Sequence, residues 1–316
     1  MSSKYQLTIG VPTYNRVGAA THNLEKIIAN GLSHRDDIEI LFIDNHSTDD
    51  TVASLKRTAG AGKNIRVLSN SRNLGFSGNF LRIIEESRGQ YVLVTSDEDL
   101  VDSNVLDDLL EILRPQTYTA VTSYFSRGGT SDYPRGNPVR TEIVDPSRYR
   151  WVANYISGVC FQTSASRNAL PILDRYQAGP AGVYIQNLLV AVLMLDGPVL
   201  SWKTQVCHPH AELPTLVPPY GYLQHRWDQT KEYLAFLDEL DATRSESRQI
   251  IASLRRGTID DVVGSFSQAL SLEGLNYQKA FEASVVNHAL QHVSTKTLAR
   301  QVLSRVRTKI RSFFLR

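Results

Sequence analysis

YVLVTSDED, residues 91–99, is the most informative stretch of the sequence, because an apolar run ends abruptly in three acids. The run predicts a buried strand, and Asp97, Glu98 and Asp99 stand at its carboxyl end. Clustered like charges are costly to desolvate unless a cation lies among them. A divalent metal that holds a diphosphate meets this need, so the stretch favours an enzyme acting on a sugar nucleotide.

The first 125 residues repeat this strand pattern and alternate it with helical periodicity. Short apolar strands are expected at 7–11, 38–43, 65–68 and 91–95, with helical segments between them. Strands separated by helices predict a parallel sheet with right-handed crossovers. The expected fold class is therefore α/β, with a mostly parallel sheet flanked by helices.

Each expected strand is followed by polar residues. Ligands of such sheets bind at the carboxyl ends of the strands. Four polar clusters fall there, at residues 12–16 (PTYNR), 44–45 (DN), 70–73 (NSRN) and 97–99 (DED). Clusters from separate strands that meet at one edge of a sheet predict a binding site at that edge.

The later part of the chain changes character twice. Strands are expected at 120–125, 141–144, 157–162 and 199–207, a helix at 188–195, and a Pro-rich lid at 208–222. Helices are then expected at about 225–255, 258–272, 277–292 and 295–314. We predict a catalytic domain over 1–222 and a helical C-terminal region over 223–316.

Composition excludes several classes of protein. The chain has 316 residues, 42% hydrophobic and 21% charged, with a formal net charge of +2, so no overall field indicates nucleic acid. Two cysteines form no disulfide framework and favour a reduced, cytoplasmic protein. No signal peptide and no apolar run long enough to span a bilayer is recognised.

The order PTYNR, IDNHSTDDT, NLGFSGN and SDED resembles the GT-A fold of glycosyltransferase family 2. The resemblance covers residues 5–125 well and continues weakly to about 210. It implies transfer of a sugar from a nucleotide diphosphate, with Mg²⁺ or Mn²⁺, to a glycan or lipid-linked acceptor. Branches that transfer deoxy sugars in surface-polysaccharide or O-antigen assembly are the expected setting.

The resemblance also implies roles for individual residues. Asp97 is expected at the ribose and donor sugar and Asp99 at the metal, which His210, or alternatively His208, also contacts. The nucleotide and donor sugar are expected to be bound by Pro12, Tyr14, Asn15, Arg16, Asp44, Asn45, Asn73, Asn79, Asp97 and Glu98.

One departure concerns the base of the nucleotide, because Asn45 stands where the family usually has a second acid. A carboxylate only accepts hydrogen bonds, whereas an amide both donates and accepts. An amide suits thymine, uracil or cytosine, so we expect a dTDP or CDP donor rather than UDP.

A second departure concerns the general base. Inverting members usually carry an acid at the start of the acceptor-side helix, but residues 182–188 read GVYIQNL, and Gln186 cannot take a proton. Either the base lies elsewhere, at Glu212, Asp196 or a histidine, or the enzyme retains configuration. The alternatives outside this activity are a nucleotidyltransferase and a GT-A-like binding or assembly protein without turnover.

The end of the chain is basic and amphipathic. Residues 283–316 contain seven Lys or Arg and no acid, with apolar residues at helical spacing. Such a helix suits an anionic membrane surface, which predicts a peripheral protein on the inner face of the membrane. The alternative is packing against its own domain or in an oligomer.

Overall fold

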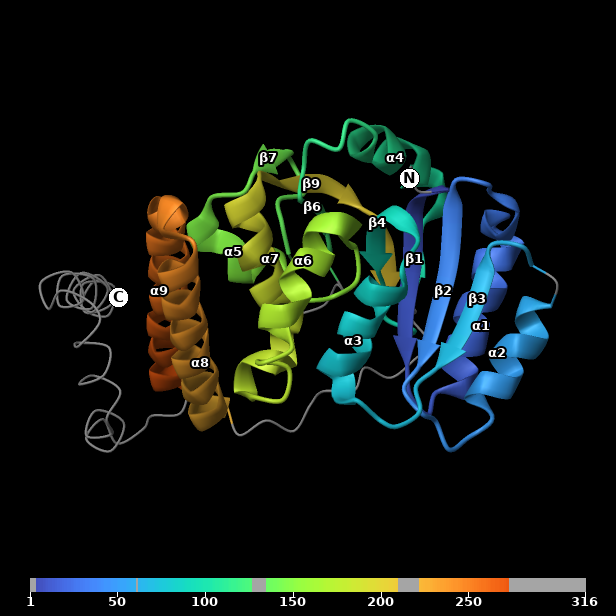
Figure 1. Ribbon diagram of the computed structural model, residues 1–316, viewed down its shortest axis with the longest axis horizontal. Helices are drawn as coiled ribbons and strands as arrows, with labels where there is room; N and C mark the ends of the chain where they lie inside the picture. The colour runs from blue at the N-terminus through green and yellow to red at the C-terminus, as the bar shows by residue number, and fades with distance from the viewer. Residues whose placement is uncertain (1–3, 61, 127–134, 210–221, 273–316) are drawn as a thin grey trace, which may run out of the picture.

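A computed structural model describes residues 4–60, 62–126, 135–209 and 222–272. Its centre is an eight-stranded sheet in the order β3-β2-β1-β4-β8-β6-β9-β7, with helices on both faces (Figure 1). A short two-stranded sheet pairs β5 with β10. The predicted α/β class, with a mostly parallel sheet, is confirmed.

The N-terminal half is the parallel half of the sheet. Strand β1 pairs in parallel with β2 and β4, and β2 pairs in parallel with β3. The elements are β1 (Tyr5–Thr13), α1 (Val17–Ala29), η1 (Leu32–His34), β2 (Ile38–Asp44), α2 (Thr51–Ala59), β3 (Ile65–Ser69), α3 (Gly75–Glu86) and β4 (Gly89–Val94). The strand–helix alternation expected from the sequence is therefore present in order.

The second half of the sheet is mixed. Strand β8 runs antiparallel between β4 and β6, while β9 is parallel to β6 and antiparallel to β7. The elements are β5 (Asp99–Val101), η2 (Ser103–Val105), α4 (Leu106–Leu113), β6 (Ala120–Tyr124), β7 (Glu142–Ile143), η3 (Pro146–Arg148), α5 (Tyr149–Val152), β8 (Val159–Gln162), α6 (Thr163–Leu173), η4 (Pro180–Tyr184), α7 (Ile185–Asp196), β9 (Val199–Gln205) and β10 (Cys207–Pro209).

Both faces of the sheet are covered by apolar side chains. On β2, Leu41 and Ile43 belong to one core cluster and Ile40 and Phe42 to the other, because successive strand residues point to opposite faces. All seven residues of this strand are buried. Burial on both faces explains why central parallel strands read as continuous apolar runs in the sequence.

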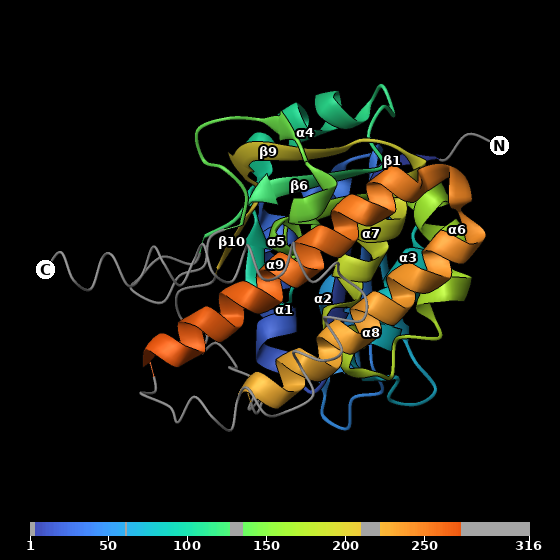
Figure 2. The same cartoon turned by 90° about the vertical axis from the view of Figure 1, so that its left-hand side faces the viewer.

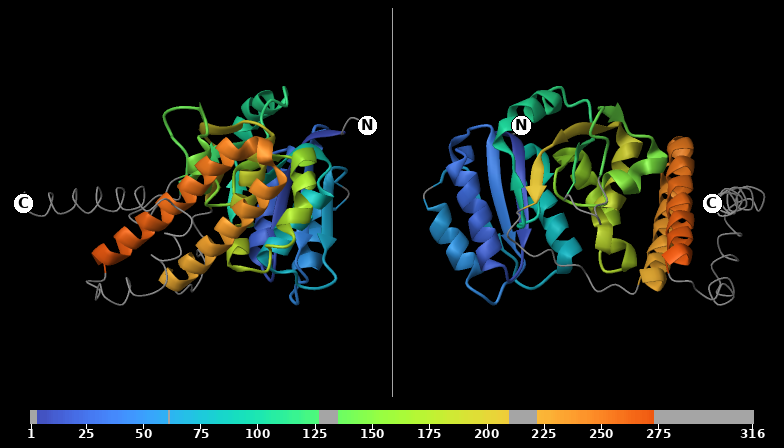
Figure 3. Two further views of the ribbon diagram at one scale, coloured as in Figure 1. Left: turned by 60° about the vertical axis from the view of Figure 1, so that its left-hand side comes forward. Right: turned by 180° about the vertical axis from the view of Figure 1, so that it is seen from behind.

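A helical hairpin of α8 (Tyr222–Thr243), η5 (Ser245–Ser247) and α9 (Arg248–Leu272) follows the sheet (Figure 2). It lies at the end of the molecule opposite β3 and α2 (Figure 3). Tyr233, Phe236 and Leu237 of α8 share a core cluster with α7. The hairpin therefore packs on α7 and on the segments η3 and η4, which lie on the second half of the sheet.

The expected break between these helices was wrong. We expected the break between 255 and 258, but α9 runs through these residues and the break lies at 244–247. The Thr243 hydroxyl donates to the Glu239 carbonyl at 2.9 Å, and such local bonds from Ser and Thr compete with helix continuation. Gly257 serves close packing, because an added Cβ would overlap the Ser147 carbonyl.

Two glycine substitutions test this packing. We expect Gly257→Ala to lower the free energy of unfolding by about 1–3 kcal/mol, because η3 must move away from α9. The matched control is Gly18→Ala in α1, where a methyl group would meet no atom within 4 Å. It should gain up to about 1 kcal/mol from helix propensity. Urea unfolding measures both, and equal effects would contradict the packing role of Gly257.

The predicted helices at 277–292 and 295–314 and most of the Pro-rich segment lie outside the described residues. Within the described ranges, no helix is both long and apolar enough to cross a membrane. The domain boundary at 222–223 stays a prediction.

Candidate active site

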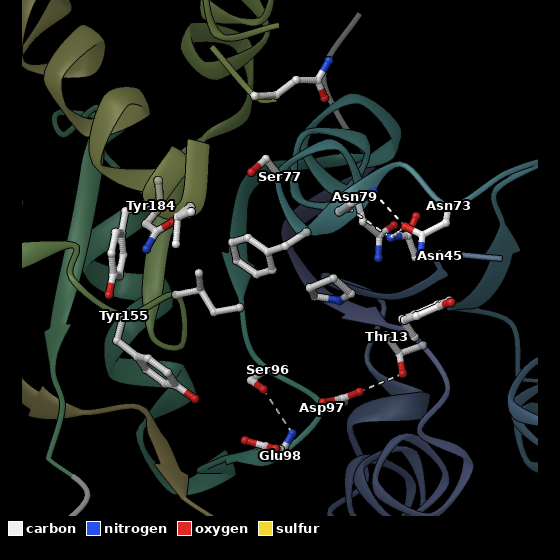
Figure 4. A pocket seen from close by; sticks show the side chains of 18 of the residues that line it. Thr13, Asn45, Asn73, Ser77, Asn79, Ser96, Asp97, Glu98, Tyr155 and Tyr184 are labelled. Atoms are coloured by element: carbon white, nitrogen blue, oxygen red, sulfur yellow. Dashed lines mark hydrogen bonds between the residues drawn. The ribbon is translucent and has the colours of Figure 1, made fainter. Parts of the chain in front are cut away.

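A pocket of about 840 Å³ opens at the carboxyl ends of the parallel strands (Figure 4). It has two sides. We call the lining residues Pro12, Thr13, Tyr14, Arg16, Asn45, Asn73, Gly75, Phe76, Ser77, Asn79, Ser96, Asp97 and Glu98 the acidic wall. The neutral wall consists of Asn154, Tyr155, Ile156, Gln177, Ala178, Gly179, Val183, Tyr184 and Gln186.

An arginine holds the two acids of the acidic wall. The Arg16 Nη1 lies 3.0 Å from Asp97 Oδ1 and 2.5 Å from Glu98 Oε1. Thr13 Oγ1 donates to Asp97 Oδ2 at 2.7 Å. Burial raises the pKa of Asp97, and the Arg16 charge and the Thr13 hydrogen bond oppose this rise. Burial acts to lower the pKa of Arg16, but the two carboxylates outweigh it and the net pKa is raised.

Asp99 does not accompany Asp97 into the pocket, which corrects its expected placement at a metal in the site. On a continuous strand, Asp97 and Asp99 would point to the same face because they are two residues apart. The chain turns here instead, and the Asp99 N–H donates to the Ser96 carbonyl at 3.1 Å. The Asp99 side chain is fully buried, accepts a 2.5 Å hydrogen bond from the Ser157 hydroxyl and is absent from the pocket lining. The same hydroxyl accepts from Ser96 N–H at 2.8 Å, so Asp99 anchors the loop that carries the acids.

Arg135, which sequence reasoning missed, fixes the opposite loop. It is fully buried and donates to the carbonyls of Tyr155 at 2.6 Å, Ser157 at 2.5 Å and Ser123 at 3.0 Å. Its guanidinium lies 5.5 Å from the centre of the Phe125 ring. Burial lowers the pKa of Arg135 to about 10. Nothing in a stretch as polar as residues 127–135 indicates that its last arginine enters the core.

The predicted polar clusters form a network of amides around Asn45. Its Nδ2 donates to Asn73 Oδ1 at 2.9 Å and to the Gly75 carbonyl at 3.0 Å. Its Oδ1 accepts from Asn70 Nδ2 at 3.1 Å and from Leu74 N–H at 2.9 Å. The amide is thus engaged within the protein, which removes the physical ground for expecting it to read the nucleotide base.

Asn79 and Asp44 belong to the same edge of the sheet. Asn79 lines the pocket and donates to the Ile43 carbonyl at 3.1 Å. Asp44 is fully buried, accepts from Ser47 N–H at 2.9 Å and from Ser69 Oγ at 3.0 Å, and is not part of the lining. Asp44 therefore organises the loop after β2.

The first loop places its residues differently. Pro12, Tyr14 and Arg16 line the pocket, as expected, but Asn15 does not. Asn15 has a φ of 51°, and its Oδ1 accepts from Thr48 N–H at 2.8 Å. It joins the first loop to the loop after β2, and an asparagine tolerates this left-handed backbone better than most residues.

Two other candidates for metal binding and base catalysis, His208 and Asp196, lie away from the pocket. His208 lies on β10, with its Nε2 3.4 Å from Asp102 Oδ2, and does not line the pocket. Asp196 is the last residue of α7 and pairs with Arg244 at 2.9 Å. His210 and Glu212 lie outside the described residues. Within those residues, no group of three or more His, Cys, Asp or Glu is placed to hold a metal.

The neutral wall is built from η4, the start of α7 and the loop before β8. The Ser77 hydroxyl of α3 donates to the Gly182 carbonyl and so ties this wall to the acidic wall. Glu232 of α8 accepts from Ala181 N–H at 2.7 Å. Tyr155 and Tyr184 lie across the pocket from Thr13, Asn45 and Asn73 (Figure 4).

Comparisons with known proteins identify the family of the chain. The model of the family "Glycosyl transferase family 2" matches residues 8–169. The dolichol-phosphate mannosyltransferase of Saccharomyces cerevisiae is 32% identical over 87 residues, 27% of this chain and 32% of that protein. The poly(ribitol-phosphate) beta-N-acetylglucosaminyltransferase TarP of Staphylococcus aureus is 23% identical over 150 residues, 45% of each chain. The chain thus spans less than half the length of these relatives.

Solved structures show the same fold. The crystal structure of S. aureus TarS 1-349 in complex with UDP-GlcNAc superposes with a TM-score of 0.60 at 15% identity, over 87% of this chain and 77% of that one. The crystal structure of S. aureus TarS 1-349 gives a TM-score of 0.59 at 13% identity and the same coverage. With the family model matching half of its residues, the chain belongs to glycosyl transferase family 2.

Proposed function

We propose that the chain transfers a glycosyl group from a nucleotide diphosphate sugar to a hydroxyl group of a glycan or lipid-linked acceptor. The observation that carries this proposal is one pocket with two unlike walls, one bearing the carboxylates of Asp97 and Glu98 and the other, as described, without charge. Family membership and the UDP-GlcNAc complex of TarS support the same reading. Assembly of a surface polysaccharide is the setting we propose for it.

On the acidic wall, residues from four loops are placed to contact the nucleotide diphosphate sugar. Tyr14, Thr13, Asn73 and Asn79 line the part of the pocket where strands β1 and β2 end, which suits the nucleoside. The Arg16 guanidinium is a planar fork of donors that matches phosphate oxygens. Because Arg16 pairs with both Asp97 and Glu98, the acids stay compensated before a diphosphate arrives.

The acids also fit a divalent metal. Mg²⁺ is usually held by one or two carboxylates together with substrate phosphates, and Asp97 and Glu98 are two hard oxygen donors at the pocket. We assign these two residues to the metal, with Glu98 replacing Asp99. When bound, Mg²⁺ or Mn²⁺ would neutralise charge on the leaving diphosphate.

Nucleotide binding tests the proposal directly. We expect UDP, dTDP, CDP or GDP to raise the melting temperature of the full chain, and Mg²⁺ or Mn²⁺ to enlarge the shift. Calorimetry then ranks the four nucleotides, which decides whether dTDP or CDP is preferred as expected from the sequence. Release of the matching diphosphate from its sugar derivative measures turnover. Failure of all four nucleotides to bind, with or without metal, would overturn the proposal.

A second measurement determines the stereochemical course of the proposed glycosyl transfer. The described lining of the neutral wall contains no acid that could take a proton from the acceptor, and Gln186 lies where the family usually has one. Either a residue outside the described ranges, such as Glu212, acts as the base, or the leaving phosphate takes the proton in a retaining reaction. The anomeric configuration of the product, determined by NMR, distinguishes these two courses.

Attachment to an anionic membrane through residues 283–316 is a further part of the proposal. Full-length protein should float with anionic liposomes, and a chain ending near 294 should float less. Equal flotation would contradict the attachment.

A further inference from the structure

Two buried amide oxygens on the neutral wall have no hydrogen-bond partner among the described residues. They are Gln186 Oε1, on a side chain that is 2% exposed, and Asn154 Oδ1. Both residues line the pocket. Burying a polar group without a partner is costly, and nearly all buried polar groups are paired in folded proteins. Hydroxyl groups of a bound ligand would supply the missing donors.

The surroundings of these amides limit the charge of that ligand. The described neutral wall carries no Lys, Arg, His, Asp or Glu, and Tyr155 and Tyr184 supply aromatic surface beside Ile156 and Val183. The Tyr155 ring is held by stacking on Phe125, with the ring centres 4.7 Å apart. A phosphate or carboxylate here would face amide oxygens with no cation on the same wall, and Arg16 of the opposite wall is already paired with Asp97 and Glu98. Both facts disfavour an anionic ligand.

We propose that the neutral wall is an acceptor subsite for an uncharged sugar, in which Gln186 and Asn154 accept hydrogen bonds from two of its hydroxyl groups. This inference rests on the proposed glycosyl transfer and names the substrate class of its acceptor. It separates this chain from TarP, whose name specifies an anionic acceptor, poly(ribitol-phosphate). A site built to pair with sugar hydroxyls discriminates strongly against ligands that lack them.

Saturation-transfer NMR on the full chain tests the charge preference. The probes are the methyl glycosides of glucose, galactose and mannose, each compared with its 6-phosphate and its uronate. They are added to the protein alone and with UDP, dTDP, CDP or GDP. We expect at least one neutral glycoside to bind more tightly than both of its charged counterparts.

A pair of variants tests the residue assignment. Gln186→Leu should weaken the binding of that glycoside about tenfold, the usual effect of losing a buried hydrogen bond. Asn187→Leu is the matched control, because Asn187 is the next residue of α7, is 3% exposed and has a similarly unpaired Oδ1, but does not line the pocket. It should leave glycoside affinity within twofold. Melting temperatures of both variants verify that they fold.

Each outcome is decisive. Tighter binding of a phosphate or uronate, or equal effects of the two variants, would overturn the subsite. If a nucleotide binds but no glycoside does, the subsite is refuted while the proposed function stands. If neither nucleotides nor glycosides bind, both proposals fail together.

Discussion

Asp97→Asn is expected to lower glycosyl transfer by about two to three orders of magnitude, the usual effect of removing a preorganised charge from a site of this kind. Asparagine keeps the shape and the hydrogen bond from Thr13 but loses the negative charge beside Arg16. Stability should not fall, because burial raises the pKa of Asp97, so the folded state already disfavours its charged form. Diphosphate release and a melting curve measure the two effects.

Two further substitutions control this result. Asp107→Asn removes a carboxylate that is 78% exposed, and it should alter neither measurement. Asp99→Ala removes the acceptor of the Ser157 hydroxyl inside the protein and should lower the melting temperature. Full activity of Asp97→Asn would contradict the assignment. An inactive but equally stable Asp99→Ala would restore Asp99 to the metal.

Arg135→Ala is expected to cost about 3–5 kcal/mol of unfolding free energy, the range seen when one member of a buried polar network is removed. The substitution leaves the carbonyls of Tyr155, Ser157 and Ser123 without their donor, at about 1–3 kcal/mol for each carbonyl left unsatisfied, and opens a cavity beside Phe125. Urea unfolding followed by fluorescence measures the loss.

The matched control for this substitution is Arg140→Ala. Arg140 is 67% exposed and pairs only across the surface with Glu142, so its removal should cost less than about 1 kcal/mol. The loss of unfolding free energy for Arg135→Lys should lie between the losses for Arg135→Ala and Arg140→Ala. A single ammonium group cannot reach three carbonyls arranged around a guanidinium. A loss below 1 kcal/mol for Arg135→Ala would show that the network does not support the loop.

The sequence predicted the sheet and its functional edge because both depend on local patterns. Parallel strands that are buried on both faces read as apolar runs, and the polar residues that end them must gather at one edge. Pro12, Tyr14, Asn73 and Asp97 were found in this way, and all four line the pocket.

What the sequence could not predict depends on turns and tertiary contacts. The two-residue period suggested that Asp97 and Asp99 act together, but a turn at Ser96 directs them into different environments. From the sequence alone, the amide of Asn45 could have bound the nucleotide base. In the structure it forms hydrogen bonds with residues that follow β3 instead. The burial of Arg135 depends on carbonyls contributed from two other segments, which no local pattern records.

The pairing of β8 with β4 has a consequence for how acceptor preference can change. Val94 is opposite Val159, so the turn with the acids and the loop with Asn154 and Tyr155 leave the sheet from adjoining rungs of one ladder. A residue inserted into β4 or β8 at this end would shift one loop relative to the other, and with it the two proposed substrate sites, by about 3.3 Å, the rise of a strand. A new acceptor is therefore gained most readily by exchanging side chains at fixed chain length, and designers who graft loops of a different size here should expect misaligned reactants.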